Sequence, residues 1–252
     1  MYAKCPKCGH AIPEADRAGA ESCPACGLVF RKYLQALSGT APRRPAGPPE
    51  PGEKRPSLLA RFLYVPERVE PWRVYAGAVL YAASVFFGVR FYLMDIPEWE
   101  MAGTFLHTAM VPFHEFGHLL FMPFGEFMNI AGGSLAQWLM PLGFLALFSF
   151  RNRDNFSASL MLWWCGTQWI DLAPYAYDAK FPQIVLLTGR TGDTGGHDYI
   201  DMLGDLGLLD RAHGVARVMH EFGLVLMLLA WAWGAYILWR QFRNRADFGN
   251  PA

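Results

Sequence analysis

The chain has 252 residues, of which 53% are hydrophobic, 15% aromatic and only 17% charged. Soluble domains carry about 25% charged residues, and the hydrophobic excess of this chain excludes an intrinsically disordered protein. Its 22 basic and 22 acidic residues cancel to a net charge of zero, so we do not expect nucleic acid as a partner. The mean hydropathy of +0.14 lies between the values of soluble enzymes and membrane bundles, which indicates two kinds of chain joined together.

The charge distribution predicts where the two parts meet. Residues 1–71 hold 18 of the 44 charged side chains, whereas residues 101–150 contain only Glu115 and Glu126. A bilayer core about 30 Å thick is crossed by about 20 apolar residues in a helix, so residues 101–150 are numerous enough for two crossings. The N-terminus is polar where a secretory signal would be apolar, so we expect no such signal.

Two CxxCG motifs, CPKCG and CPACG, lie in the first predicted domain, residues 1–37. A glycine after the second cysteine allows a tight turn that directs backbone N–H groups toward the thiolates. Four thiolates at this spacing predict a structural Zn²⁺ site that folds a segment too short for its own core, with two disulfides as the alternative. Over residues 5–27 the pattern resembles the zinc-ribbon family. The predicted ligands are Cys5, Cys8, Cys23 and Cys26.

Residues 38–70 are predicted to form a disordered, proline-rich linker. Its first 20 residues, 38–57, contain six prolines and three glycines, a composition that prevents a regular helix or strand. Basic residues follow before the apolar part begins. By the positive-inside rule they predict that the N-terminus and the ribbon lie in the cytoplasm.

Residues 71–245 are predicted to form a transmembrane domain in a lipid bilayer, which we expect to be a bacterial cytoplasmic membrane. The predicted fold class is therefore mostly α, a polytopic bundle of four to five segments preceded by the zinc ribbon. Five crossings from a cytoplasmic start would end outside, against the arginines that follow the last segment. Gly132-Gly133 therefore predicts a re-entrant loop at 127–135. The five apolar segments are 74–89, 101–124, 127–150, 156–177 and 222–239.

The second segment contains His114-Glu115-Phe116-Gly117-His118, an H-E-x-x-H sequence. Residues four apart on a helix are separated by about 40° of rotation, so both imidazoles face one point and can share a metal ion. Glu115 lies beside them, where its carboxylate can take a proton from a water molecule at that metal. Ionisable groups are costly inside a bilayer, so their presence there indicates a functional site.

An HEFGH sequence within an apolar segment resembles the site-2 protease family, the intramembrane zinc metalloproteases of the M50 type. The resemblance covers residues 101–124 closely and the glycine-rich residues 127–135 loosely. It implies that His114 and His118 bind the catalytic Zn²⁺ and that Glu115 is the catalytic base. The family's third ligand is an aspartate in an L-D-G type motif of a later transmembrane segment, and this sequence has no clean copy of that motif.

Two residues are candidates for the third ligand. Asp171, in the sequence WIDLAP, lies well inside the fourth segment, at a depth that could match that of His118. His197, in the sequence GGHD, belongs to a commoner class of zinc ligand, and the glycine pair before it allows the loop to fold inward with Asp198 in support. The sequence leaves this choice open.

Together these features predict zinc-dependent hydrolysis of peptide bonds in membrane-protein substrates. One Zn²⁺ would be catalytic in the membrane domain and the other structural in the ribbon. The ribbon would recruit or regulate through a cytoplasmic protein partner, because a tethered module raises the local concentration of what it binds. The alternatives are a non-proteolytic membrane adaptor that binds zinc and a membrane protein that handles the metal itself.

Overall fold

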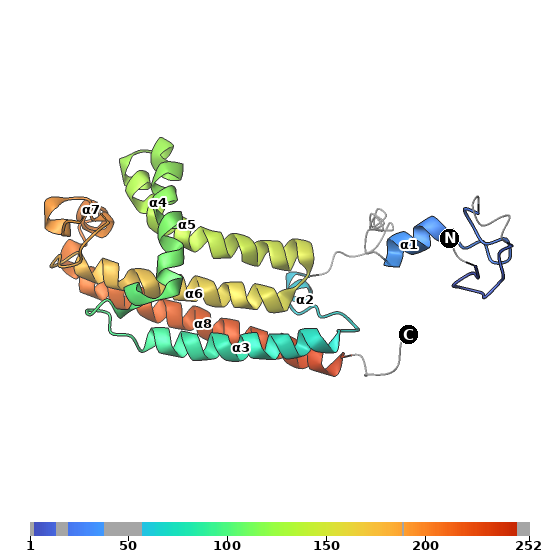
Figure 1. The fold of residues 1–252 in the computed structure, drawn as a ribbon. Helices are drawn as coiled ribbons and strands as arrows, with labels where there is room; N and C mark the ends of the chain where they lie inside the picture. The colour runs from blue at the N-terminus through green and yellow to red at the C-terminus, as the bar shows by residue number, and fades with distance from the viewer. Residues whose placement is uncertain (1–2, 14–19, 38–56, 188, 246–252) are drawn as a thin grey trace. The chain divides into compact units, whose positions relative to one another are not determined.

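The computed structural model describes residues 3–13, 20–37, 57–187 and 189–245. The chain divides into two compact units, residues 1–55 and 56–252. The described part is mostly helical, which confirms the predicted fold class at that level (Figure 1).

The first unit is organised by the two CxxCG turns. The backbone φ is positive at both closing glycines, 72° at Gly9 and 69° at Gly27, a conformation that glycine adopts without steric cost. Each of these glycines donates its N–H to the carbonyl oxygen of the first cysteine of its motif. The second turn leads into helix α1, Phe30–Leu37. Isolated antiparallel bridges flank the turns, pairing Lys4 with Ala11 and Ser22 with Val29.

The four cysteines of this unit form one cluster. All are unbonded, and one sulfur from each lies within 4.8 Å of the others. The Sγ atoms are 3.7 Å apart in both the Cys5–Cys26 pair and the Cys8–Cys23 pair. With Zn–S distances of about 2.3 Å, a tetrahedral site separates its sulfurs by about 3.8 Å. The cluster could therefore hold a metal ion, and its dimensions fit zinc better than the alternative of two disulfides.

Replacing Cys23 with serine is expected to lower the zinc content of the purified full-length chain by about one ion per molecule, because a hydroxyl does not substitute for a thiolate ligand. Metal analysis by mass spectrometry measures this loss. Cys165→Ser is the matched control, since Cys165 belongs to the second unit, and it should leave the zinc content unchanged. Full zinc content in Cys23→Ser would show that the cysteine cluster does not hold the ion.

The second unit is built from helices of very different length. Its α-helices are α2 (Leu58–Phe62), α3 (Pro71–Tyr92), α4 (Phe105–Phe121), α5 (Glu126–Ala146), α6 (Asn155–Asp178), α7 (Asp198–Asp205) and α8 (Ala212–Arg243). A π-helical turn, Leu147–Asn152, continues α5. Short 3₁₀ helices occupy Glu100–Gly103, Met122–Phe124, Gly192–Thr194 and Leu209–Arg211.

Three helical stretches are long and apolar enough to cross a membrane, which is consistent with the predicted membrane protein. They are Pro71–Tyr92, Glu126–Asn152 and Leu209–Arg243. α6 has 24 residues but buries polar side chains, among them Thr167 and Gln168. Figure 1 shows α3, α6 and α8 running alongside one another, with α4 running across them.

Glycines bring α6 and α8 into close contact. A Cβ atom added at Gly166 would lie 2.7 Å from the carbonyl oxygen of Gly223, and one at Gly223 would lie 2.6 Å from that of Gly166. Small residues of this kind let helix backbones approach in an apolar medium, where van der Waals packing drives helix association. α6 is consequently enclosed by its neighbours and holds its polar side chains in a fixed place.

The predicted re-entrant loop at 127–135 is wrong, because these residues belong to the continuous helix α5. The glycines there serve packing against α4. A Cβ atom at Gly132 would lie 2.5 Å from the carbonyl oxygen of Gly117, and one at Gly117 would lie 2.2 Å from that of Gly132. Glycine at this position is required by the close approach of two helices, a demand that the sequence alone does not distinguish from a turn.

Residues 57–70, which belong to the predicted linker, are part of the second unit and contact the start of α6. The Asn155 side chain donates hydrogen bonds to the carbonyl oxygens of Arg61 and Tyr64, at 2.7 and 2.9 Å. These contacts tie the segment to the first residue of α6. The remaining linker residues, 38–56, lie outside the described residues.

Candidate metal centre

A cavity of about 220 Å³ lies where α4, α5, α6 and the loop before α7 meet. Its lining combines imidazole and carboxylate groups with an apolar wall. The polar lining residues are His107, His114, Glu115, His118, Gln137, Asp171, Tyr175 and Asp198; the apolar ones are Trp99, Val111, Leu172, Val185, Leu186 and Leu187. The cavity therefore contains all three polar residues of the H-E-x-x-H sequence.

Helix α4 brings these three residues together, as predicted. It begins after Thr104, whose side-chain oxygen accepts a hydrogen bond from a backbone N–H of the first turn. The ring centroids of His114 and His118 are 4.9 Å apart. One potential ligand atom each from His114, Glu115 and His118 lies within 4.8 Å of the others, so this group could hold a metal ion.

Hydrogen bonds determine which nitrogen of each histidine faces the cavity. Nδ1 of His114 lies 2.7 Å from Oε1 of Gln137, and Nδ1 of His118 lies 2.9 Å from the backbone oxygen of Asn129. Both partners are acceptors, so each Nδ1 carries a proton, and each Nε2 faces the cavity, where it donates to a carboxylate or, once its proton is lost, binds a metal ion. The Gln137 amide cannot be turned round, because its nitrogen donates to the Asp171 carboxylate at 3.3 Å.

The two Nε2 atoms converge on the carboxylate of Asp198, the first residue of α7. Oδ2 of Asp198 lies 2.8 Å from Nε2 of His114 and 3.4 Å from Nε2 of His118. The backbone N–H of Asp198 donates to the Tyr175 hydroxyl at 3.1 Å, which positions the start of the helix. Burial by itself raises the pKa of Asp198, but hydrogen bonds with the two histidines hold that pKa below its usual range, so the carboxylate is charged at neutral pH.

This donor set fits a zinc ion. With Zn–N and Zn–O distances of about 2.0–2.1 Å, tetrahedral ligands lie about 3.4 Å apart. The separation between His118 Nε2 and Asp198 Oδ2, 3.4 Å, matches that value. The shorter 2.8 Å between Asp198 and His114 is a hydrogen-bond distance that a small rotation of the carboxylate would lengthen. Two imidazoles and one carboxylate leave a fourth position open, which is typical of catalytic zinc sites.

Gly133 of α5 makes room for the His114 ring. A Cβ atom added there would lie 2.4 Å from Nε2 and 2.7 Å from Cδ2 of His114. Real Cβ atoms do not approach other heavy atoms so closely, and the backbone of a packed helix cannot retreat. The second glycine of the Gly132-Gly133 pair is therefore required by the site itself.

We expect Gly133→Ala to displace the His114 ring and to remove about one zinc ion per chain, because a metal ligand must keep its orientation to within a few tenths of an ångström. Gly143→Ala on the same helix is the matched control. A Cβ atom at Gly143 meets nothing within 4 Å, so this variant should keep its zinc. Zinc content and Tm are measured on both variants. Full zinc content in Gly133→Ala would contradict the role assigned to His114.

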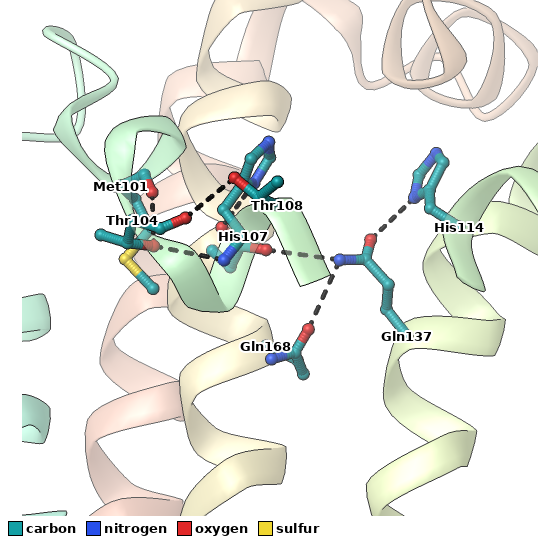
Figure 2. A network of polar contacts seen from close by, with 8 residues as sticks. Met101, Thr104, His107, Thr108, His114, Gln137 and Gln168 are labelled. Atoms are coloured by element: carbon teal, nitrogen blue, oxygen red, sulfur yellow. Dashed lines mark hydrogen bonds and ion pairs between the residues drawn. The ribbon is translucent and has the colours of Figure 1, made fainter. Parts of the chain in front are cut away.

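Asp171 lies near the histidine pair but does not contact either histidine directly. Oδ1 of Asp171 lies 2.8 Å from Nδ1 of His107, and Oδ2 accepts the hydrogen bond from Gln137. Figure 2 shows Gln137 between His107 and His114, and the Gln137 amide donates a further hydrogen bond to Gln168. Gln137 projects from α5 into the space between α4 and α6, and its amide connects Asp171 to His114 by hydrogen bonds.

His197, the other predicted third ligand, is buried away from the histidine pair. Its side chain is fully enclosed, its Nε2 lies 3.3 Å from Oδ2 of Asp178, and its ring centroid lies 4.2 Å from that of Tyr175. A Cβ atom at Gly192 would lie 2.7 Å from the His197 ring, so the loop closes tightly around it. His197 therefore anchors the loop from which α7 and Asp198 follow.

The sequence predicted Asp198 as a support for His197; in the structure Asp198 contacts the two motif histidines, whereas His197 contacts Asp178. His197 has an extended backbone, with φ −106° and ψ 104°. In an extended segment successive side chains point to opposite sides, so two adjacent residues do not both face the cavity. The GGHD sequence indicated the segment that contacts the histidine pair, but it did not indicate that Asp198 makes the contact.

The chain matches no protein-family model, no curated protein and no solved structure. Its function is therefore inferred from the geometry of the site.

Proposed function

We propose that this protein is a zinc-dependent endopeptidase that hydrolyses peptide bonds of membrane-protein substrates. The observation that carries the proposal is the convergence of two histidine Nε2 atoms on one carboxylate inside a cavity that also contains Glu115. The H-E-x-x-H sequence supports a metallopeptidase site over a general metal site, because it places a further carboxylate beside the two histidines.

His114, His118 and Asp198 would hold the ion. Asp198 replaces Asp171 and His197 as the proposed third ligand, because its carboxylate alone of the three contacts both histidines. A bound Zn²⁺ lowers the pKa of a water ligand to about 7 and polarises a carbonyl group. Gln137 and the backbone of Asn129 keep the two imidazoles in the tautomer that binds the metal.

Glu115 would move the proton. Its side chain lines the cavity, and its carboxylate is not a partner in the hydrogen bonds described for His114 and His118. Its carboxylate would accept a proton from the attacking water and donate it to the nitrogen of the leaving amine. The residues that line the cavity would hold the peptide carbonyl within reach of the attacking oxygen.

The walls of the cavity suit a polypeptide with apolar side chains. Leu172 and Val111 form one apolar part, and residues 185–187 form another on the loop before α7. A transmembrane segment would have to be partly unwound to enter, because a helix uses its carbonyl groups in its own hydrogen bonds. A membrane protein with a locally extended stretch is therefore the proposed substrate.

The zinc ribbon would act on this activity from the cytoplasm. Its described part holds one metal-sized cysteine cluster and only a single short helix, α1. A module of that size, attached by a linker, can bind a cytoplasmic protein and raise its concentration at the membrane. We propose that it recruits or regulates, and that catalysis belongs to the second unit.

Metal removal tests the proposed activity. Cleavage of a reconstituted single-pass membrane protein by the purified full-length chain should fall at least about tenfold after chelation with 1,10-phenanthroline and return on addition of Zn²⁺. The Cys23→Ser variant should show the same dependence, which separates the membrane site from the ribbon. Zinc-independent cleavage would exclude the proposed mechanism. Two zinc ions per chain without cleavage of any membrane substrate would favour the adaptor or metal-handling alternatives.

A further inference from the structure

Basic residues predominate at one end of the second unit, and acidic residues predominate at the other. At one end α3 begins, α5 connects to α6, and α8 finishes, as the 3.7 Å salt bridge between Arg73 and Asp154 and the bridge between Val69 and Arg245 show. We call this the arginine end. Its segments 57–73, 148–155 and 240–245 contain eight basic and three acidic residues. The basic residues are Arg61, Arg68, Arg73, Arg151, Arg153, Arg240, Arg243 and Arg245.

The opposite end has the reverse balance. Its segments 90–104 and 179–211 contain four basic and eight acidic residues. Basic residues near the ends of membrane segments stay on the cytoplasmic side. The arginine end is therefore assigned to the cytoplasm, and the acidic connections to the extracytoplasmic side.

Helix arithmetic places the metal centre far from the arginine end. On α6, Asp171 follows Asn155 by 16 residues, and Gln137 of α5 precedes Asn152 by 15 residues. At about 1.5 Å per residue these side chains lie about 24 Å and about 22 Å from that end. The hydrocarbon core of a bilayer is about 30 Å thick, so the centre lies in its far third.

Contacts with α3 independently place the metal centre at the same depth along the bundle. Arg73 and Arg90 bracket α3 and are 17 residues apart, about 26 Å along the axis. Phe91, next to Arg90, packs in one buried cluster with Ile170, the neighbour of Asp171. The metal centre therefore lies level with the second polar boundary of α3.

Helix α4 does not follow the direction of the bundle, as Figure 1 shows. It has 17 residues, and its outward face is apolar, with Phe116 57% and Leu119 62% exposed. Because α4 runs across the other helices, we count it as no crossing of its own. α3, α5, α6 and α8 then make four crossings, and an even number returns the chain to the side on which it entered.

We infer that the metal centre opens on the extracytoplasmic side of the membrane, opposite the arginine end. As a refinement that rests on the proposed peptidase function, the substrate is a membrane protein whose scissile bond lies at the extracytoplasmic end of its membrane segment. Val185 and Leu187 line the cavity at that face, and 68% and 74% of their surfaces are exposed. They offer apolar contacts to an extended stretch that leaves the bilayer there.

Cysteine labelling tests the orientation without any requirement for activity. Asp205→Cys in α7 and Arg151→Cys at the arginine end are made in the full-length chain, both at exposed positions. A membrane-impermeant polyethylene-glycol maleimide is applied to spheroplasts and to everted vesicles of the expression host, with the wild type as background. We expect at least tenfold stronger labelling of Asp205→Cys in spheroplasts and of Arg151→Cys in everted vesicles. The reverse pattern, or labelling of both from one side, overturns the inference.

A pair of substrates tests the position of the scissile bond. Two single-pass membrane proteins carry the same helix-unwinding Gly-Pro pair, one at the extracytoplasmic and one at the cytoplasmic end of the membrane segment. The first should be cleaved at least tenfold faster. Preferential cleavage of the second would overturn the inference while leaving the peptidase proposal standing. Cleavage of neither would remove the peptidase proposal and the substrate refinement with it, whereas the orientation is decided by the labelling.

Discussion

Replacing Asp198 with alanine is expected to remove the zinc ion of the membrane unit, lowering the content of the purified full-length chain from about two ions to about one. The carboxylate lies 2.8 and 3.4 Å from the two histidine Nε2 atoms, so its loss leaves two ligands where a catalytic site needs three. Zinc content is measured on protein purified in detergent, and cleavage of a membrane substrate should be lost in parallel.

The control for this variant is Asp171→Asn. Asparagine keeps an oxygen that can accept from His107 or Gln137, and Asp171 contacts neither motif histidine directly. Asp171→Asn should therefore retain about two zinc ions, with at most the ten- to hundredfold loss of affinity that supporting hydrogen bonds around metal ligands account for. If Asp171→Asn loses the ion and Asp198→Ala keeps it, the third ligand is Asp171 and the assignment made from the geometry is wrong.

Replacing Glu115 with glutamine should abolish cleavage while keeping the metal. Glutamine preserves the shape of the side chain but cannot take up a proton, and positioned general bases contribute about 10²- to 10⁴-fold to rate. We expect kcat for a membrane-protein substrate to fall by a factor within that range, with the zinc content unchanged. Because metal and rate are measured on the same preparation, a structural effect is separated from a catalytic one.

Glu221→Gln is the matched control for Glu115→Gln. Glu221 lies in a second His-Glu-Phe-Gly sequence, on α8, where its carboxylate accepts a hydrogen bond from the Tyr92 hydroxyl. It is outside the cavity lining, so the same chemical change there should leave cleavage unaltered. Unchanged cleavage in Glu115→Gln would mean that another group takes the proton.

Much of the metal chemistry could be predicted from the sequence because it depends on local spacing. In a helix, residues four apart face one side, so His114 and His118 meet whatever the rest of the fold does. In a CxxCG turn the glycine adopts positive φ and the two cysteines lie on one side of the turn. Both clusters in the described residues that could hold a metal ion were therefore predictable from such motifs.

The helices of the second unit were predicted less evenly. Apolar length identified α3, α5 and α8, because crossing a bilayer is a requirement on composition. It also suggested that the segment holding α4 crosses, and a glycine pair suggested a break in α5. Close helix packing and an open turn both favour glycine, and only the contact between Gly117 and Gly132 distinguishes them.

From the low charged fraction and the two motifs, the sequence by itself predicted a mostly helical chain with membrane-length apolar helices and two candidate metal clusters, one of them including Glu115. Only the tertiary structure decided which distant carboxylate faces the histidine pair. Asp171, His197 and Asp198 are all acidic or imidazole side chains in suitable segments, and they differ in the direction each one points. That direction follows from the packing of α6 on α8 and from the buried His197 that anchors the loop before α7. Such contacts join residues far apart in the chain, and no local spacing encodes them.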